Sequence, residues 1–237
     1  MHQQIPNGII ASEVIVLTFK INPFKENWTD YADVLPKNEM DRAEEFHYSQ
    51  DKLRFSKCRS ILRNTLSKWL NNDPEELEIT VSTNGKPYLK QKHSIKFSIS
   101  HTEGFAGIAF SRDHEIGLDV ENCNRDTNII EVAKKVFTLS ERAIIDAESD
   151  IDKRKMFFRF WTSKEAFLKT TGLGLSLDPK KVNLNLQTEN KKYGTLECSH
   201  ISHSSSLRLV ELTCPEPYIM TVCTSEEALG NVNVFFL

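Results

Sequence analysis

The chain has 237 residues, enough for one large domain or for two domains of roughly half that length. Its hydrophobic (39%) and charged (27%) contents are ordinary for a globular protein, and its net charge of −3 argues against a general affinity for nucleic acid or for an anionic membrane. No apolar run approaches the roughly 20 residues of a membrane helix, and no secretory signal is recognisable. The five cysteines include no C-x-x-C pair, which predicts reduced thiols and a cytoplasmic location.

The first part of the chain predicts one strand followed by two helices. Residues 13–20 (EVIVLTFK) are typical of a strand, and a polar helix is expected over residues 37–47. A longer helix is expected over residues 50–70, with Ser49 as its N-cap. Its apolar positions recur at helical spacing and predict a buried stripe, made of Cys58, Ile61, Leu62, Thr65, Leu66 and Trp69.

The same helix carries an unusual run of charge. Between residues 52 and 68 it has six basic residues and no acidic one, namely Lys52, Arg54, Lys57, Arg59, Arg63 and Lys68. A solvent-facing helix normally mixes both signs, because like charges one turn apart repel each other. The run therefore indicates either a docking site for phosphates or an ordinary solvated face, and the sequence favours neither.

A group of short strands follows this helix. After a strand over residues 77–82, a tight turn presents Lys86, and three more strands are expected over residues 97–100, 105–111 and 115–121. His101 ends the first of these three. A single histidine in such a place is more often structural, but beside Ser100 and Lys86 it is also suited to holding a phosphate.

The strand over residues 115–121 places two carboxylates together. Side chains alternate along a strand, so Asp119 and Glu121 share a face, with α-carbons roughly 6.6 Å apart. Two carboxylates this close repel each other unless a cation lies between them, and their oxygens suit Mg²⁺. An ordinary solvent-facing strand shows the same alternation, and this segment alone favours that plainer interpretation.

The second half predicts helices and then strands. A helix is expected over residues 128–136, and another opens near residue 138 with Ser140 as its cap. The stretch over residues 156–177 is a strongly apolar helix stopped by Gly172 and Gly174. Strands are expected over residues 181–186, 206–212 and 218–224.

Glu165 is the acidic residue of interest in the apolar helix. It lies one turn from both Trp161 and Lys169, on the same face. An ordinary Glu–Lys helix pair explains this spacing. A glutamate and the lysines Lys164 and Lys169 among bulky aromatic residues also indicate a functional site, and the two interpretations stay open on spacing alone.

Taken together, five stretches resemble the Sfp-type 4'-phosphopantetheinyl transferases. They are DKLRFSKCRSILR (51–63), GKP (85–87), FSISHT (97–102), IGLDVE (116–121) and FRFWTSKEAFLKTTGLGLSL (158–177). The resemblance implies an α+β fold of two pseudo-symmetric lobes, each a small, mostly antiparallel sheet packed on a long helix, with the active site in the cleft between them. It also implies transfer of 4'-phosphopantetheine from coenzyme A to a serine of an apo acyl or peptidyl carrier protein, with Mg²⁺ as cofactor and 3',5'-ADP as the second product.

The resemblance also implies roles for individual residues. The metal would be held by Asp119, Glu121 and Glu165. Glu165 would take the serine proton, and Lys169 and Lys164 would stabilise the charge that develops on the phosphate oxygens. The nucleotide end of coenzyme A would be held by Arg54, Lys86, Ser100 and His101, with further help from Lys37 and Arg42. Glu39 stands where some members of the family have a cation.

We therefore expect an N-terminal lobe over residues 1–114 for the nucleotide end of coenzyme A and a C-terminal lobe over residues 115–237 for the metal and catalytic residues. We expect a monomer with no nucleic-acid or membrane partner. A Mg²⁺-dependent nucleotide phosphohydrolase and a non-catalytic coenzyme A-binding module would use the same residues. The sequence does not identify the carrier protein, the preferred metal or the tolerance for acyl-coenzyme A.

Overall fold

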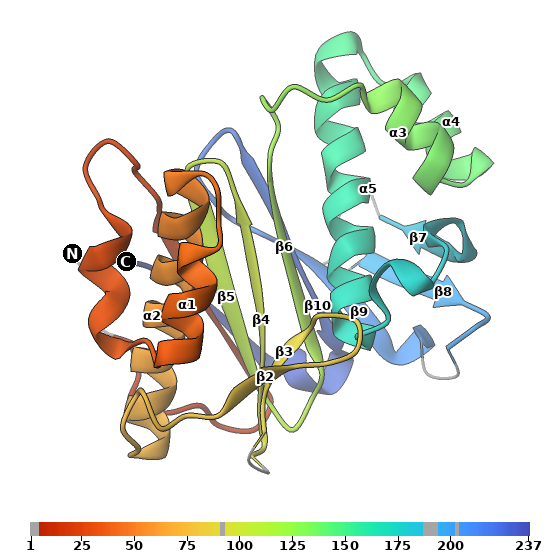
Figure 1. Cartoon of the computed structure of the whole chain (residues 1–237). Coiled ribbons are helices and arrows are strands. Elements are labelled where there is room, and N and C mark those ends of the chain that lie inside the picture. Colours follow the sequence, from red (N-terminus) through yellow and green to blue (C-terminus); the bar gives the residue numbers. More distant parts are fainter. Residues whose placement is uncertain (1–4, 91–92, 187–193, 202–203) are drawn as a thin grey trace.

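The structure is a computed structural model that describes residues 5–90, 93–186, 194–201 and 204–237. Its main elements form four layers, in which two β-sheets lie between two long helices (Figure 1). Within the described part of the chain, no helix is long and apolar enough to cross a membrane.

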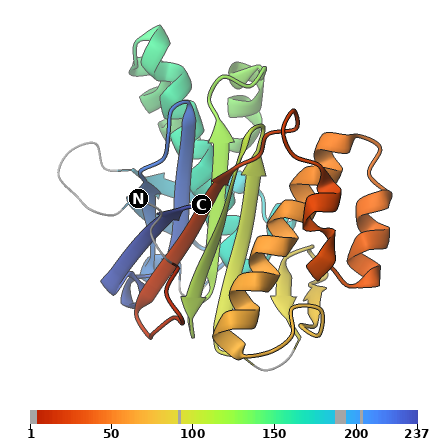
Figure 2. The ribbon, with the colours of Figure 1, turned by 90° about the vertical axis from the view of Figure 1, so that its left-hand side faces the viewer.

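The N-terminal layers consist of a four-stranded sheet and the helix that covers it. The strands, in spatial order, are β11 (Asn231–Phe236), β1 (Glu13–Lys20), β5 (Phe105–Arg112) and β4 (Ile95–Thr102). The long helix α2 (Ser49–Leu70) packs on this sheet, and α1 (Lys37–Glu44) lies against α2. All pairings are antiparallel except that of β1 with β11, which brings the last strand of the chain beside the first (Figure 2).

The C-terminal layers repeat this plan. The sheet has the spatial order β6 (Ile116–Asn122), β10 (Tyr218–Ser225), β9 (Leu207–Leu212), β8 (Gly194–Cys198) and β7 (Val182–Asn185). The long helix α5 (Asp150–Thr171) covers it, with α3 (Ile129–Val136) and α4 (Leu139–Ala147) beside α5. A separate ribbon of β2 (Ile79–Val81) and β3 (Pro87–Leu89) lies between the two halves at one end (Figure 1).

Three apolar cores separate the four layers, and strand alternation explains them. In β5, Phe105 and Ala109 face the core between the two sheets, whereas Ile108 and Phe110 face α2. A strand covered on both faces reads as a continuous apolar run, which is the pattern of FAGIAF. The third core lies between α5 and the C-terminal sheet and is rich in phenylalanine.

The two sheets are joined along one edge by side chains. Hydroxyl oxygens of β4 accept backbone N–H groups of β6 at 3.0, 3.1 and 3.3 Å: Ser98 from Leu118, Ser100 from Val120, and Thr102 from Asn122. β6 is an edge strand, so these N–H groups have no neighbouring strand to bind. Leaving them buried and unpaired would be costly, and the alternating hydroxyls of the stretch SISHT remove that cost.

The expected α+β fold of two lobes, each a mostly antiparallel sheet on a long helix, is confirmed. Two caps differ from expectation: Tyr48 is the N-cap of α2 in place of Ser49, and Thr138 caps α4 through a capping box with Glu141 in place of Ser140. The strands β8 and β11 were not expected from the sequence. A division of the chain near residue 114 stays a prediction.

Gly117 tests how closely α5 packs on β6. A β-carbon at this position would lie 2.0 Å from the carbonyl oxygen of Ala166 and 2.5 Å from the amide nitrogen of Thr170. We expect Gly117→Ala to lower the free energy of unfolding by about 1–3 kcal/mol or more, because the helix must move away from the strand. Urea denaturation measures the loss.

Gly8→Ala is the matched control, because a β-carbon there meets no atom within 4 Å. We expect its free energy of unfolding to stay close to that of the unchanged chain. An equal free energy for Gly117→Ala would show that the close contact is relieved at no cost, contrary to the packing described.

Candidate active site

The candidate site lies between β6 and α5. Along β6, Leu118 and Val120 enter the core between the sheets, so Asp119 and Glu121 point the other way, toward α5. Both carboxylates are nearly buried, at 5% and 8% exposure. Glu165 of α5 is half-buried and close enough to Asp119 for their charges to interact. The fold thus brings the three predicted acidic residues into one region.

Asp119 is the best-connected member of this group. Its Oδ1 accepts hydrogen bonds from Lys169 Nζ at 2.7 Å and from the Ser100 hydroxyl at 2.9 Å. Lys169 also donates to the Ser100 oxygen at 2.9 Å, so the three side chains form a closed triangle. The second oxygen, Oδ2, is buried and has no hydrogen-bond partner among the described residues.

Glu121 has a different set of partners from Asp119. Its Oε1 accepts a hydrogen bond from Trp161 Nε1 at 2.9 Å and forms an ion pair with Arg125 at 3.0 Å. Its Oε2 accepts only a long hydrogen bond, at 3.5 Å, from Thr102. In the sequence, Trp161 lies one turn from Glu165 with no role indicated, and Arg125 does not stand out. The only sequence signal for Arg125 is its position four residues after Glu121.

Burial and mutual repulsion act on these acids together. Burial, with a further contribution from the Asp119 carboxylate, raises the pKa of Glu121 to about 7. Burial and Asp119 also raise the pKa of Glu165. Negative charge is therefore disfavoured here unless a cation enters. Within the described ranges, no three His, Cys, Asp or Glu side chains lie close enough together to hold a metal ion as they stand.

His101 points to the face of β4 opposite Ser100, toward the start of α2, where Arg54 lies. Arg54 forms an ion pair with Asp51 at 3.3 Å. Although the His101 side chain keeps an exposed surface, its enclosure by protein atoms and the charges of Arg54 and Lys169 lower its pKa to about 4. His101 is therefore neutral at pH 7, and the cations around it form a local positive region suited to an anion.

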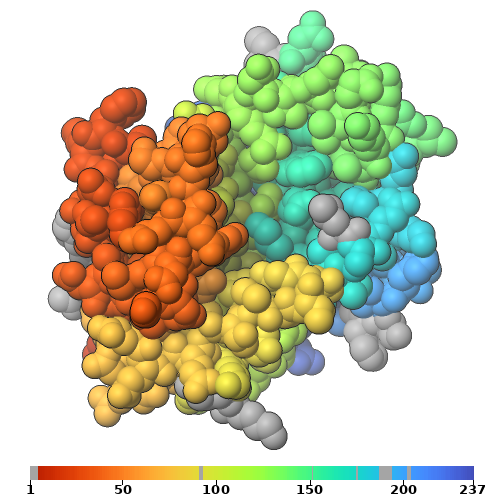
Figure 3. Space-filling view, viewed as in Figure 1, coloured from red at the N-terminus to blue at the C-terminus, as the bar shows by residue number. Residues whose placement is uncertain are grey.

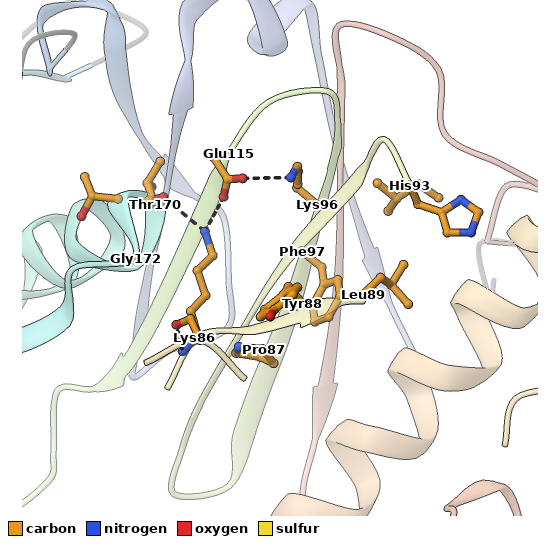
Figure 4. Close-up of a pocket in the computed structure, with 13 residues that line it drawn as sticks. Lys86, Pro87, Tyr88, Leu89, His93, Lys96, Phe97, Glu115, Thr170 and Gly172 are labelled. Atoms are coloured by element: carbon orange, nitrogen blue, oxygen red, sulfur yellow. Dashed lines mark hydrogen bonds and ion pairs between the residues drawn. The ribbon is translucent and has the colours of Figure 1, made fainter. Parts of the chain in front are cut away.

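Lys86 lines a pocket of about 390 Å³ whose walls include Pro87, Tyr88 and Phe97 (Figure 4). Its ammonium group lies 2.8 Å from Oε2 of Glu115 and donates to the Thr170 carbonyl at 3.2 Å. Lys96 pairs with the other oxygen of Glu115 at 3.1 Å. Despite the burial that would raise it, the two lysines lower the pKa of Glu115. Lys86 thus ties the turn after β2 to the end of α5.

One face of the molecule is hollowed between its two halves (Figure 3). In Figure 3, the face is hollowed between α1 and α2 on one side and the helices of the C-terminal half on the other. β4 and β6 run between these helices in the same view (Figure 1). The side chains of Ser100, Asp119 and Lys169 belong to this junction.

Comparison with known proteins identifies the family. Residues 115–223 match the model of the 4'-phosphopantetheinyl transferase superfamily, and residues 20–113 match that of the 4'-phosphopantetheinyl transferase N-terminal region. The chain belongs to this superfamily. Its relatives include the 4'-phosphopantetheinyl transferase HetI of Nostoc, 30% identical over 171 residues and covering 71% of this chain and 72% of the relative. The Synechocystis protein slr0495 is 32% identical over 205 residues (83% and 82%), and the Bacillus subtilis transferase Sfp is 24% identical over 170 residues (72% and 75%).

In this phosphopantetheinyl transferase, Lys164 does not join the catalytic group, which corrects its predicted role. The side chain is only 2% exposed and forms an ion pair with Glu141 at 2.8 Å. It also donates to the carbonyl oxygens of Pro179 and Val182, each at 2.8 Å. One residue along a helix turns a side chain by about 100°, so the neighbour of Glu165 faces the core.

The basic run of α2 is neither a phosphate-docking site nor a solvated face as a whole, because some of its cations are buried in ion pairs. Lys57 is nearly buried and pairs with Glu26 at 2.5 Å. Arg63 is 1% exposed and donates to both oxygens of Glu39, at 2.8 and 3.0 Å. The balancing acids come from other segments of the transferase. Of the cations in the run, Arg54 lies beside His101.

The two basic residues expected on α1 lie on the surface of that helix. Lys37 is exposed, and exposed Arg42 pairs with Glu45 at 2.5 Å. Glu39 is buried at 5% exposure and binds Arg63 of α2, so its side chain faces α2 and fastens α1 to it. A role for Lys37 and Arg42 in binding coenzyme A stays a prediction.

The Glu39–Arg63 pair gives a stability test. Glu39→Ala leaves a buried guanidinium without its carboxylate, and we expect it to lower the free energy of unfolding by about 3–5 kcal/mol. The matched control is Glu45→Ala, which breaks the exposed pair with Arg42 and should cost less than about 1 kcal/mol. Chemical denaturation of both variants measures the difference, and equal losses would contradict the structural role of Glu39.

Proposed function

We propose that this chain transfers the 4'-phosphopantetheine group of coenzyme A to a serine of an apo acyl or peptidyl carrier protein, with Mg²⁺ as cofactor and 3',5'-ADP as the second product. Membership of the transferase superfamily supports the reaction class. The observation that carries the proposal is the buried acidic group between β6 and α5, tied through Lys169 and Ser100 to the junction of the two lobes.

The acidic group fits a magnesium ion by its chemistry. Mg²⁺ takes hard oxygen ligands, usually one or two carboxylates together with water and substrate phosphates. Oδ2 of Asp119 is a buried acceptor without a described partner, and Oε2 of Glu121 has one long contact. Glu165 would complete the set. When bound, the ion would neutralise these carboxylates and polarise the phosphate oxygens of coenzyme A.

Residues of the chain account for the remaining chemistry. The carrier serine oxygen attacks the β-phosphorus of coenzyme A, and the bond from that phosphorus to the bridging oxygen breaks. The phosphopantetheine stays on serine, and the bridging oxygen leaves with 3',5'-ADP. Glu165 accepts the serine proton, directly or through water. Lys169 stabilises the negative charge that develops on the phosphate oxygens.

The nucleotide end of coenzyme A would lie across the junction on the side of β4. Arg54 supplies positive charge for the 3'-phosphate beside the neutral His101, and Ser100 and Lys169 connect this region to Asp119. The pocket beside Lys86, with Tyr88 and Phe97 in its walls, is the candidate site for the adenine ring of coenzyme A. Because the Lys86 ammonium binds Glu115 and Thr170, we propose that this residue shapes the pocket.

The remaining parts of the proposal concern context. Both lobes contribute to the site within one chain, so a monomer would suffice for catalysis. All five cysteines lie in the described part of the chain and are free thiols, in agreement with the expected reducing compartment. A cytoplasmic location and the identity of the carrier protein stay predictions.

The 3'-phosphate assignment is tested by comparing coenzyme A with dephospho-coenzyme A. We expect Arg54→Ala to weaken binding of coenzyme A by about 1.5–3 kcal/mol, because a charge-assisted hydrogen bond is lost, and to leave dephospho-coenzyme A nearly unchanged. Isothermal titration calorimetry measures both affinities. Lys68→Ala, at the exposed far end of α2, removes the same charge and should change neither. Equal weakening of both ligands by Arg54→Ala would place Arg54 away from the 3'-phosphate.

The acidic group is tested with two variants and a purified apo carrier protein. Asp119→Ala should abolish Mg²⁺-dependent modification of the carrier, because it removes a ligand and the anchor of Lys169. Glu165→Gln keeps an oxygen but cannot accept a proton, so it should lower kcat far more than it weakens coenzyme A binding. Mass spectrometry of the carrier and release of 3',5'-ADP are the measurements. Asp146→Ala, whose carboxylate is exposed, is the matched control.

Other outcomes would point to other functions. A near-normal rate for Asp119→Ala would mean that the metal site is misplaced, and a near-normal rate for Glu165→Gln would remove Glu165 as the base. Cleavage of coenzyme A without a carrier would support a nucleotide phosphohydrolase. Binding of coenzyme A with neither cleavage nor transfer would support a non-catalytic binding module.

A further inference from the structure

The indole of Trp161 makes a specific contact with one oxygen of Glu121. Its N–H donates to Oε1 at 2.9 Å. The ring itself is fixed by stacking on Phe157, with an interplanar angle of 10° and centroids 6.3 Å apart. Phe157 is fully buried in the C-terminal core. The orientation of the donor therefore derives from the core and does not depend on solvent.

This contact makes the two carboxylate oxygens of Glu121 unequal. Oε1 receives both the indole N–H and the guanidinium of Arg125, at 2.9 and 3.0 Å. Among the described residues, Oε2 has only the 3.5 Å contact with Thr102. Because Trp161 and Arg125 both bind Oε1, the Glu121 carboxylate is held in one orientation. Oε2 is then the oxygen available to a further ligand.

Arg125 is held near this carboxylate by the same aromatic wall. Its guanidinium lies 5.4 Å from the ring centre of Phe158 and 5.9 Å from that of Trp161. These cation–π contacts give the cation a favourable position that does not require the carboxylate. Trp161 thus contacts both the acid and the positive charge that balances it.

We propose that Trp161 is a positioning residue for the metal ligand Glu121: its N–H fixes Oε1 so that Oε2 is directed to the ion, while Arg125 is a built-in counter-charge that competes with the ion for this carboxylate. The inference rests on the proposed metal site. It predicts opposite effects for two neighbouring residues. Loss of the N–H weakens metal binding, whereas loss of the competing cation strengthens it.

The test uses Mn²⁺ as a probe of the metal site in the full chain. The ion is titrated into the protein with and without coenzyme A, in the absence of any carrier, and free Mn²⁺ is measured by electron paramagnetic resonance. Trp161→Phe keeps an aromatic ring but removes the N–H, and we expect it to raise the Mn²⁺ dissociation constant by about tenfold, as for other partners of metal ligands. Arg125→Met should lower this constant by roughly two- to fivefold.

A matched tryptophan serves as control. Trp69 also donates its indole N–H, to the carbonyl oxygen of Pro6 at 2.8 Å, but it lies in the N-terminal half. Trp69→Phe should leave Mn²⁺ binding unchanged. Thermal unfolding without metal supplies a second measurement: Arg125→Met should lower the melting temperature, because Glu121 loses its counter-charge.

The outcomes separate this inference from the proposed function. Unchanged Mn²⁺ binding by Asp119→Ala would overturn the metal site itself. If Asp119→Ala loses Mn²⁺ binding but Trp161→Phe binds as tightly as Trp69→Phe, the positioning role is overturned and the metal site stands. Weaker binding by Arg125→Met would overturn the competition and make Arg125 a supporting residue. If Trp161→Phe fails to fold, Arg125→Met still tests the competition, and Trp161→Tyr, whose hydroxyl lies elsewhere than the indole N–H, then tests the role of the N–H.

Discussion

Three side-chain hydroxyls hold the two lobes in register, and the candidate site depends on them. They accept backbone N–H groups of β6, which would otherwise be buried without partners at the edge of a sheet. Serine is small enough to let β4 approach this edge closely. Ser100 has a second role, because the same hydroxyl that accepts the Val120 N–H donates to Asp119. A change in how the lobes meet would therefore displace the acidic group as well.

Charge balance is the second constraint, and it opposes the first. Closing α5 over β6 buries carboxylates, and this burial, together with the charge of Asp119, raises the pKa of Glu121 and of Glu165. The chain offsets this with its own cations, Lys169 on Asp119 and Arg125 on Glu121. Such pairs keep the protein folded without a metal while leaving oxygens available to one. Activity and stability are thus coupled through the same few contacts, as is common where like charges are gathered for catalysis.

Local sequence patterns predicted much of the fold and part of the candidate site. The alternation in β6 predicted that Asp119 and Glu121 share a face, and the order of five motifs predicted the two lobes. Contacts between distant segments were not visible: the acids that neutralise Lys57 and Arg63 lie on other elements, at Glu26 and Glu39. Lys164 differs from Glu165 by one position, and only packing shows that it faces the core. The alternation in β11 (NVNVFF) is a local strand signal that was overlooked, whereas its pairing with β1, at the other end of the sequence, has no local signal.

The pairing of β1 with β11 also bears on how the protein comes to be made. Glu13 lies opposite Asn231, so the N-terminal sheet lacks an edge strand until the C-terminal sheet, which ends with β10, has been synthesised. During translation, β1 must wait with one side uncovered while the entire C-terminal lobe emerges. Contacts of this sequence separation slow folding, and an open strand edge invites pairing with other chains. The two lobes share the junction that holds the candidate site. Through β11, the N-terminal sheet is also completed only after the strands of the C-terminal sheet have been synthesised.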